Sequence, residues 1–188
     1  DQVFASNTSA IPISRIAQKS IAPERVLGMH FFSPVEKMPL LEIVVTDKTA
    51  DWASDRAFRI GVRMGKQIIV VKDGPGFYTT RALAFFLAEA ALLLEEGANI
   101  EEIDQALTDF GFPVGPITLM DEVGIDVGIH VLSSMKEAFG DRIKTPAGLD
   151  VVEKSGRLGR KNGKGFFLYE NGTKLGPDTS IYGLMSEH

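Results

Sequence analysis

The sequence of 188 residues contains no cysteine. This absence excludes disulfide bonds, thiolate metal sites and a cysteine nucleophile. Histidine is also scarce, and His30, His130 and His188 have no ligand spacing between them. A histidine metal site is therefore not expected, and we predict a functional site without a metal ion.

Basic residues are fewer than acidic ones, which gives a net charge of −5 at pH 7 and an isoelectric point near 5.3. Proteins that bind nucleic acids usually carry a basic face that neutralises phosphates, so this class is disfavoured. Long apolar runs without charge are missing too. The most apolar stretch, residues 82–94, contains Glu89 and is too short and too charged to span a bilayer, so we interpret it as a buried helix.

A third absence concerns dinucleotide binding. No G-x-G-x-x-G motif follows any predicted strand, so the backbone donors that cradle a pyrophosphate are missing from this sequence. The sequence begins Asp1-Gln2, with neither an initiator methionine nor a basic leader. We therefore expect it to be an internal part of a larger protein.

Two kinds of sequence meet near residue 74. Before it, short β-branched runs alternate with helical patterns, which predicts an α/β layer. The expected strands are residues 3–5, 25–32, 40–46 and 67–71, and the expected helices are residues 12–20 and 51–64. The last of these strands is continuously apolar, which indicates that both of its faces are covered.

After Gly74-Pro75-Gly76 the strand patterns stop, and we predict an all-α second part. The expected helices are residues 77–96, 100–110 with Asn99 as N-cap, a region from 116 to 139 interrupted at Gly124, and 146–155. The polar tail after Glu170 is expected to be poorly ordered. The first of these helices is apolar nearly all round, which predicts an exposed apolar face for a partner.

His30 and Glu42 are the first candidates for chemistry. His30 lies near the end of one expected strand and Glu42 lies inside the next. If the strands are neighbours, the carboxylate can orient the imidazole, and such a pair is a standard general base for taking a proton from a hydroxyl. A charge within the apolar run around Glu42 is costly to bury unless it is paired. The spacing alone also permits two side chains that never meet.

Three further segments carry polar or flexible residues. The turn at residues 6–9 follows a strand, where ligands usually bind in α/β sheets, although a simple turn or helix cap has the same composition. Residues 73–81 start a helix whose N-terminus can hold an anion, or form a hinge between domains. The basic, glycine-rich residues 159–167 can hold a phosphate or form an exposed loop, and they lack the spacing of an ATP site.

Taken together, these segments resemble the 3-hydroxyacyl-CoA dehydrogenase family. The matching stretches occur in the family's order over roughly residues 3–169: FASNTS at 4–9, HFFSP at 30–34, Glu42, KDGPGF at 72–77, FGFPVGP at 110–116, DEVG at 121–124 and GRKNGKGF at 159–166. The resemblance implies an α/β plus all-α fold. Residues 1–74 would be the C-terminal part of a Rossmann-type NAD-binding domain, and residues 75–188 the helical C-terminal dehydrogenase domain.

The resemblance also implies an NAD-dependent oxidation of (3S)-3-hydroxyacyl-CoA to 3-ketoacyl-CoA. In that assignment His30 is the general base and Glu42 orients it. Asn7, Ser9 and Ser33 are the implied cofactor contacts, and the substrate contacts are Ser9, Ser33 and Thr80. The family often has asparagine at the positions of Ser33 and Thr80, and their shorter side chains put those two roles in doubt.

The version of the helix start found here, Gly76-Phe77-Tyr78-Thr79-Thr80-Arg81, is similar to that of multifunctional α-subunits of fatty acid oxidation complexes. The parent protein would then also carry enoyl-CoA hydratase (lyase) activity and bind a thiolase β-subunit. The family implies a homodimer or intrachain pseudo-dimer through the helical domain. It also implies a cytoplasmic location in a bacterium or the mitochondrial matrix in a eukaryote. Without a pyrophosphate loop, the 188 residues alone are expected to be inactive.

Two other interpretations stay open on the sequence. One is a helical dimerisation or scaffolding module in which His30 has no catalytic role. The other is a dehydrogenase of small β-hydroxyacids, a related group with the same α/β-then-helical layout. That group commonly uses a lysine base, so the pair of His30 and Glu42 argues against it. The contact between these two side chains is the observation that separates the interpretations.

Overall fold

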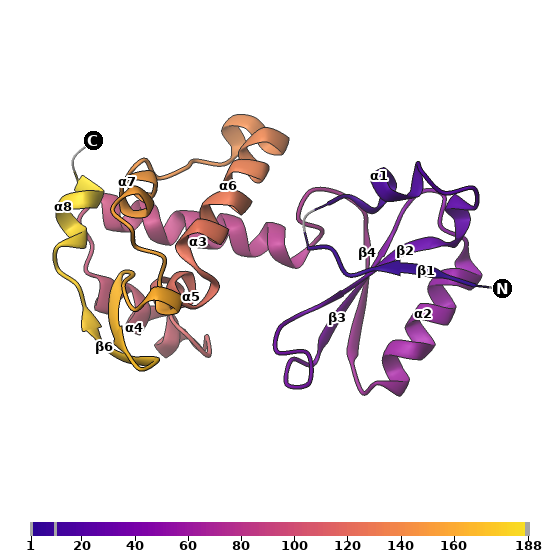
Figure 1. Cartoon of the computed structure of the whole chain (residues 1–188), viewed down its shortest axis with the longest axis horizontal. Helices are drawn as coiled ribbons and strands as arrows, with labels where there is room; N and C mark the ends of the chain where they lie inside the picture. The colour runs from indigo at the N-terminus through magenta and orange to yellow at the C-terminus, as the bar shows by residue number, and fades with distance from the viewer. Residues whose placement is uncertain (1, 10, 187–188) are drawn as a thin grey trace. The chain divides into compact units, whose positions relative to one another are not determined.

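The computed structural model describes residues 2–9 and 11–186, so His188 lies outside the described residues. The chain divides into two compact units, Asp1–Arg81 and Ala82–His188. Figure 1 follows the chain from the sheet of the first unit into the helices of the second. The expected α/β layer followed by a helical part is confirmed.

The first unit is built on a mixed sheet with the order β1-β2-β3-β4 (Figure 1). Its strands are β1 (Phe4–Ser6), β2 (Val26–Phe31), β3 (Leu40–Val45) and β4 (Gln67–Lys72). β1 is parallel to β2, β2 is antiparallel to β3, and β3 is parallel to β4. In the antiparallel pair, His30 lies directly opposite Glu42. All four strands coincide with those expected from the sequence to within two residues at either end.

Successive side chains of a strand point to opposite faces of the sheet, and each face of this sheet packs into its own hydrophobic core. On one face, Leu27, Met29, Leu41 and Ile43 pack against Ala53 and Ala57 of helix α2 (Asp51–Arg63). On the other face, Val26 and Val44 pack with Phe77 and with helix α1 (Ile13–Ala17). Because side chains alternate along a strand, His30 and Glu42 belong to this second face. Each fully buried aliphatic side chain contributes about 1.5–3 kcal/mol, so the two cores fix the register of the strands.

The expectation that both faces of the fourth strand are covered is met only in part, since Ile68 packs against one core and Val71 against the other. Val70 is 53% exposed, and the other residues of β4 are at best half-buried. β4 is the last strand in the order of the described sheet, so α2 covers it only in part. The apolar run identified the strand correctly, but a run of this kind does not report how much of it is covered.

The second unit is mainly helical. Its elements are α3 (Thr79–Glu95, which begins in the first unit), α4 (Ile100–Phe110), α5 (Pro116–Val123), α6 (Ile125–Phe139), α7 (Gly148–Lys154) and α8 (Ile181–Ser186), with short 3-10 turns at Gly140–Arg142 and Arg160–Asn162. The predicted cap is confirmed, since the Asn99 side chain accepts hydrogen bonds from the Glu101 and Glu102 amides. The predicted interruption at Gly124 is confirmed too, with φ of 103°. Within residues 2–9 and 11–186, no helix has the length and hydropathy needed to cross a bilayer.

The C-terminal tail was expected to be poorly ordered and to follow a part without strands. The structure differs on both points. A hairpin of β5 (Phe167–Glu170) and β6 (Thr173–Pro177) follows the glycine-rich segment, and α8 follows the hairpin. Arg157 anchors this region, because its side chain is 2% exposed and donates to the Gly165 carbonyl and to Asp178. Burial raises the pKa of Asp178, but the hydrogen bonds from Ser180 and the Arg157 guanidinium together outweigh burial and hold this pKa down to about 2.

The glycine-rich segment wraps around a buried carboxylate. Asp121 at 0% exposure accepts hydrogen bonds from the amides of Phe166 and Phe167, at 2.9 and 2.8 Å, and from the Tyr169 hydroxyl. A Cβ at Gly165 would lie 2.0 Å from an oxygen of this carboxylate. Glycine is therefore required at Gly165 for steric reasons, because only backbone without a side chain fits over Asp121.

We predict that Gly165→Ala lowers the free energy of unfolding by about 1–3 kcal/mol, the usual effect of forcing a methyl group into a packed site. Gly176→Ala is the matched control, since a Cβ there meets nothing within 4 Å. Chemical denaturation of both variants checks the difference. Equal midpoints for the two variants would show that the loop yields around Asp121 at little cost.

Candidate active site

His30 and Glu42 form a buried pair across neighbouring antiparallel strands. The distance between His30 Nδ1 and Glu42 Oε2 is 2.6 Å. The side chain of His30 is 7% exposed and that of Glu42 is fully buried. The contact expected from the sequence is confirmed, and the geometry is that of a charge-assisted hydrogen bond.

Three more donors reach the same carboxylate. The backbone amides of Tyr78 and Thr79 donate to Glu42 Oε1 at 3.2 and 2.9 Å. The Thr79 hydroxyl donates to Oε2, the oxygen that meets His30, at 2.7 Å. The first amides of a helix have no partner within the helix, and they carry its partial positive charge. Glu42 therefore caps α3, and the anion expected at this helix start is one of the chain's own side chains.

A tight turn aims these donors at Glu42. Gly76 has φ of 65° and Phe77 has φ of 48°, a left-handed conformation that is unfavourable for a residue with a side chain. Phe77 is held there because its ring is 2% exposed and packs in the core beside His30, with the ring centroids 5.8 Å apart. The backbone strain is thus compensated by packing next to the pair, and the turn places the Tyr78 and Thr79 amides over Glu42.

The electrostatics keep Glu42 ionised. Burial alone would raise the pKa of the Glu42 carboxyl, but the hydrogen bonds from His30 and Thr79 outweigh burial and hold this pKa below its ordinary value. A carboxylate that carries a full charge makes the neutral imidazole donate through Nδ1. The other ring nitrogen, Nε2, then carries a lone pair that can accept a proton. The ring itself is fixed by Phe32, with a centroid distance of 4.5 Å.

The remaining predicted site residues all belong to the first unit. Asn7 follows β1, and its side-chain oxygen accepts from the Phe31 amide at 2.9 Å, so it is held beside the strand that carries His30. Ser9 and Ser33 are exposed, in the bend after β1 and the loop after β2. Thr80 is half-buried in the first turn of α3. Thr79, the neighbour of Thr80, contacts the pair directly but was not among the residues predicted from the sequence.

The other two polar segments have structural partners. Both Asp73 carboxylate oxygens accept from the amides that open α1, those of Ile13 and Ser14, at 2.8 Å. In the glycine-rich segment, Lys161 pairs with Asp126 and Arg160 with Glu122. Two of its three basic side chains thus face carboxylates of the chain itself. This arrangement matches the alternative of a loop packed at the surface better than a phosphate site.

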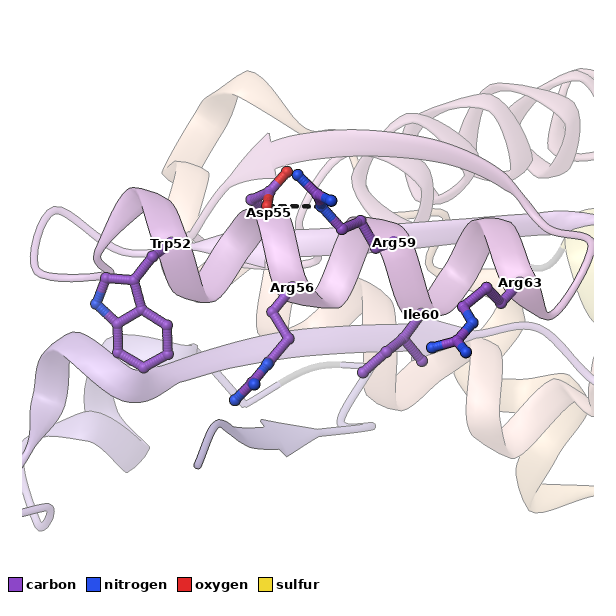
Figure 2. Close-up of a pocket in the computed structure, with 6 residues that line it drawn as sticks. All are labelled: Trp52, Asp55, Arg56, Arg59, Ile60 and Arg63. Atoms are coloured by element: carbon purple, nitrogen blue, oxygen red, sulfur yellow. Dashed lines mark hydrogen bonds and ion pairs between the residues drawn. The ribbon is translucent and has the colours of Figure 1, made fainter. Parts of the chain in front are cut away.

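A groove of about 490 Å³ lies elsewhere on the first unit, along the exposed side of α2. Figure 2 shows the side chains that line it: Trp52, Asp55, Arg56, Arg59, Ile60 and Arg63. The 2.8 Å ion pair of Arg59 with Asp55 is the dashed contact in the figure. Because α2 covers the face of Leu27 and Leu41, this groove lies across the sheet from His30 and Glu42. It is therefore not part of the candidate active site.

The residues present fit one end of an NAD molecule only. The turn after β1 has polar groups at the carboxyl end of a parallel strand, where α/β sheets bind ligands, and Asn7 is positioned there by β2. A carboxamide such as that of nicotinamide can hydrogen-bond to groups of this kind. The sequence contains no glycine-rich loop that would hold the pyrophosphate.

Comparison with known families matches two adjoining regions. Residues 1–74 match the family described as 3-hydroxyacyl-CoA dehydrogenase, NAD binding domain. Residues 76–169 match 3-hydroxyacyl-CoA dehydrogenase, C-terminal domain. Together the two matches cover nearly the whole chain.

Among curated relatives, the fatty acid oxidation complex subunit alpha of Shewanella sp. strain MR-4 is 50% identical over 188 residues, or 97% of this chain. The chain spans 26% of the length of that protein. The same subunit of Shewanella baltica strain OS185 is 49% identical over 185 residues and is also matched over 26% of its length.

Two solved structures with the same fold are 3-hydroxybutyryl-CoA dehydrogenases. (S)-3-hydroxybutyryl-CoA dehydrogenase from Ralstonia eutropha is 34% identical with a TM-score of 0.86, and the match covers 90% of this chain and 61% of that chain. 3-Hydroxybutyryl-CoA dehydrogenase from Escherichia coli K12 is 36% identical with a TM-score of 0.84, over 94% of this chain and 39% of that chain. The sheet that joins His30 to Glu42 and the helical unit that follows it therefore belong to a member of the NAD-dependent 3-hydroxyacyl-CoA dehydrogenase family.

Proposed function

We propose that this chain is the catalytic part of an NAD-dependent (3S)-3-hydroxyacyl-CoA dehydrogenase that forms 3-ketoacyl-CoA. The observation that carries the proposal is the buried 2.6 Å contact between His30 and an ionised Glu42. In this proposal residues 1–74 are the C-terminal part of the NAD-binding domain and residues 75–188 are the helical dehydrogenase domain. Family membership supports the reaction type, and the geometry supports the assignment of the base.

His30 is the general base of the proposed reaction. The Glu42 carboxylate accepts a hydrogen bond from Nδ1–H, so Nε2 is the nitrogen that takes the proton from the 3-hydroxyl of the substrate. As the imidazole becomes positively charged, the Glu42 carboxylate stabilises that charge within a largely buried site. The C3 hydrogen leaves with its electron pair, and acceptance of this hydride is the chemistry that NAD supplies when bound.

The polar loops of the first unit have the binding roles in this proposal. Asn7, Ser9 and Ser33 hold the nicotinamide end of the cofactor, and Ser9, Ser33 and Thr80 contact the acyl-CoA near its hydroxyl or carbonyl oxygens. Support for these roles comes from the position of Asn7, fixed against the backbone of Phe31 next to His30. Serine and threonine hydroxyls both donate and accept, as a hydroxyl or carbonyl ligand requires.

The parent protein is proposed to be a multifunctional α-subunit. The relatives that are about half identical to this chain are named as α-subunits of fatty acid oxidation complexes, and the chain spans about a quarter of their length. Such a parent would also have enoyl-CoA hydratase activity and associate with a thiolase β-subunit. The curated relatives are bacterial, which favours the bacterial cytoplasm over the mitochondrial matrix as the location.

A dimer or intrachain pseudo-dimer through the helical domain is part of the same proposal. The second unit exposes an aromatic group at the end of α4, where Phe110 is 82% exposed. Phe112 stacks on Phe86 with a centroid distance of 5.0 Å and lies 6.2 Å from Phe110. Exposed apolar surface of this kind is common at protein interfaces.

We predict that His30→Gln in the longer protein lowers kcat by about 10²–10⁴-fold, the range in which general base catalysis contributes. The assay follows NADH absorbance with 3-hydroxyacyl-CoA as substrate, and thermal unfolding confirms that the variant is folded. His130→Gln is the control, because His130 is exposed on α6. Retention of kcat within a few-fold in the His30 variant would refute the assignment of the base.

Glu42→Gln is expected to reverse the tautomer of His30. The amide oxygen can still accept from Tyr78 and Thr79, but the NH2 group then faces His30 Nδ1, which becomes an acceptor. The imidazole proton then lies on Nε2, the nitrogen that should take the proton from the substrate. Because Nε2 can no longer act as the base, we expect turnover to fall about as far as in His30→Gln. Nitrogen-15 NMR of the imidazole identifies the tautomer. An unchanged Nδ1–H tautomer in the variant would contradict this explanation.

We expect the 188-residue chain alone to bind NAD weakly and to show no useful turnover. The amides of a glycine-rich loop are absent, and without oriented cofactor binding about 7–11 kcal/mol of proximity effect is lost. Calorimetric titration with NAD and an NADH absorbance assay test this, with the longer protein as the positive control. Tight NAD binding by the chain would place a complete cofactor site within these residues.

A further inference from the structure

The hydroxyl of Thr79 shares a carboxylate oxygen with the catalytic pair. Glu42 Oε2 meets His30 Nδ1 at 2.6 Å and the Thr79 hydroxyl at 2.7 Å. Oε1 meets the backbone amides of Tyr78 and Thr79. A carboxylate offers about four acceptor positions, and four protein donors reach this one.

These four donors have different roles. The two amides hold Oε1 and depend on the turn at Phe77, so they do not require a particular side chain at position 79, proline excepted. With only Oε1 held, the carboxylate can still rotate, and Oε2 moves away from His30. The Thr79 hydroxyl is the one side-chain donor besides His30 that is observed on Oε2 in the described structure. A valine, which has the same shape, would keep the helix cap and remove this single restraint.

We propose that Thr79 is a positioning residue of the dehydrogenase, whose hydroxyl fixes the Glu42 carboxylate so that Oε2 stays on His30 Nδ1. This inference rests on the proposed function of the pair. Thr79 acts through Glu42 and not on the substrate. Its neighbour Thr80, which has the substrate role in the proposed function, is not part of this contact.

The lowered pKa of Glu42 agrees with this role. Burial opposes the charged form, and the contacts that favour it come from the His30 side chain and from both the amide and the hydroxyl of Thr79. The hydroxyl therefore influences two properties of the carboxylate, its orientation and its charge. Both properties determine whether His30 keeps its Nδ1 proton and leaves Nε2 to act as the base.

The test uses Thr79→Val and Thr79→Ser in two settings. In the 188-residue chain, carbon-13 NMR follows the titration of the Glu42 carboxyl, and nitrogen-15 NMR follows His30. In the longer protein, NADH absorbance gives kcat and KM for a 3-hydroxyacyl-CoA. We expect Thr79→Val to raise the pKa of Glu42 and to lower kcat about tenfold, with KM changed less than about twofold. Thr79→Ser should restore both quantities.

Thr49→Val is the matched structural control. It removes a threonine hydroxyl from the same unit, one that donates to the Val26 carbonyl at 2.9 Å and has no contact with Glu42. It is expected to lower stability without changing the Glu42 titration or kcat. If Thr79→Val behaves as Thr49→Val does, Thr79 is only structural and the inference fails. A fall in kcat without a change in the Glu42 titration also overturns it.

Failure of the proposed function gives a different pattern. If His30→Gln leaves turnover intact, the pair is not the base of the reaction. The Glu42 titration and the His30 tautomer in Thr79→Val then decide alone whether Thr79 positions Glu42. An unchanged titration refutes the positioning role, and a shifted titration that serine reverses supports it.

Discussion

A charged carboxylate in the core is the constraint on which the first unit depends. Glu42 is fully buried, and an ionised group in such a place is tolerated only when its oxygens are filled with donors. The antiparallel pairing of β2 and β3 supplies one donor from His30. The strained turn at Phe77 and the first residues of α3 supply the others. The sheet, the turn and the helix start are thus arranged around one charge.

Pairing of a carboxylate with backbone amides recurs elsewhere in the chain. Buried or half-buried carboxylates accept from pairs of consecutive amides: Glu42 from residues 78 and 79, Asp73 from 13 and 14, Asp104 from 117 and 118, and Asp121 from 166 and 167. Three of these pairs open helices α1, α3 and α5, and the fourth closes the loop before β5. Each joins segments distant in sequence, because a side-chain anion satisfies backbone donors that helix or sheet leaves unpaired.

The parts predicted well from sequence are those controlled by local pattern. β-Branched runs identified the strands, and Asn99 identified its helix. The pairing of His30 with Glu42 was expected from the family resemblance and the cost of burying Glu42 alone, because the spacing by itself left open whether the two strands are neighbours. Thr79 was not identified because its contact depends on a left-handed residue, and Phe77 is not a residue type that predicts one. The hairpin after Gly165 was overlooked because its fold is determined by Asp121, more than forty residues earlier. The coverage of β4 was overestimated for a similar reason, since burial depends on neighbours that the strand's own sequence does not specify.

The pairing of β2 with β3 has a consequence for how such a chain can change over time. His30 faces Glu42 only in one alignment of the strands, and a shift by one residue would turn either side chain to the α2 face. The exposed loop between the strands, from Ser33 to Pro39, can lengthen or shorten without changing that alignment. A single insertion inside either strand would change the alignment. Tolerance to insertions should therefore change sharply at the strand ends, because inside the strands both the packing of the two cores and the contact of His30 with Glu42 depend on the alignment.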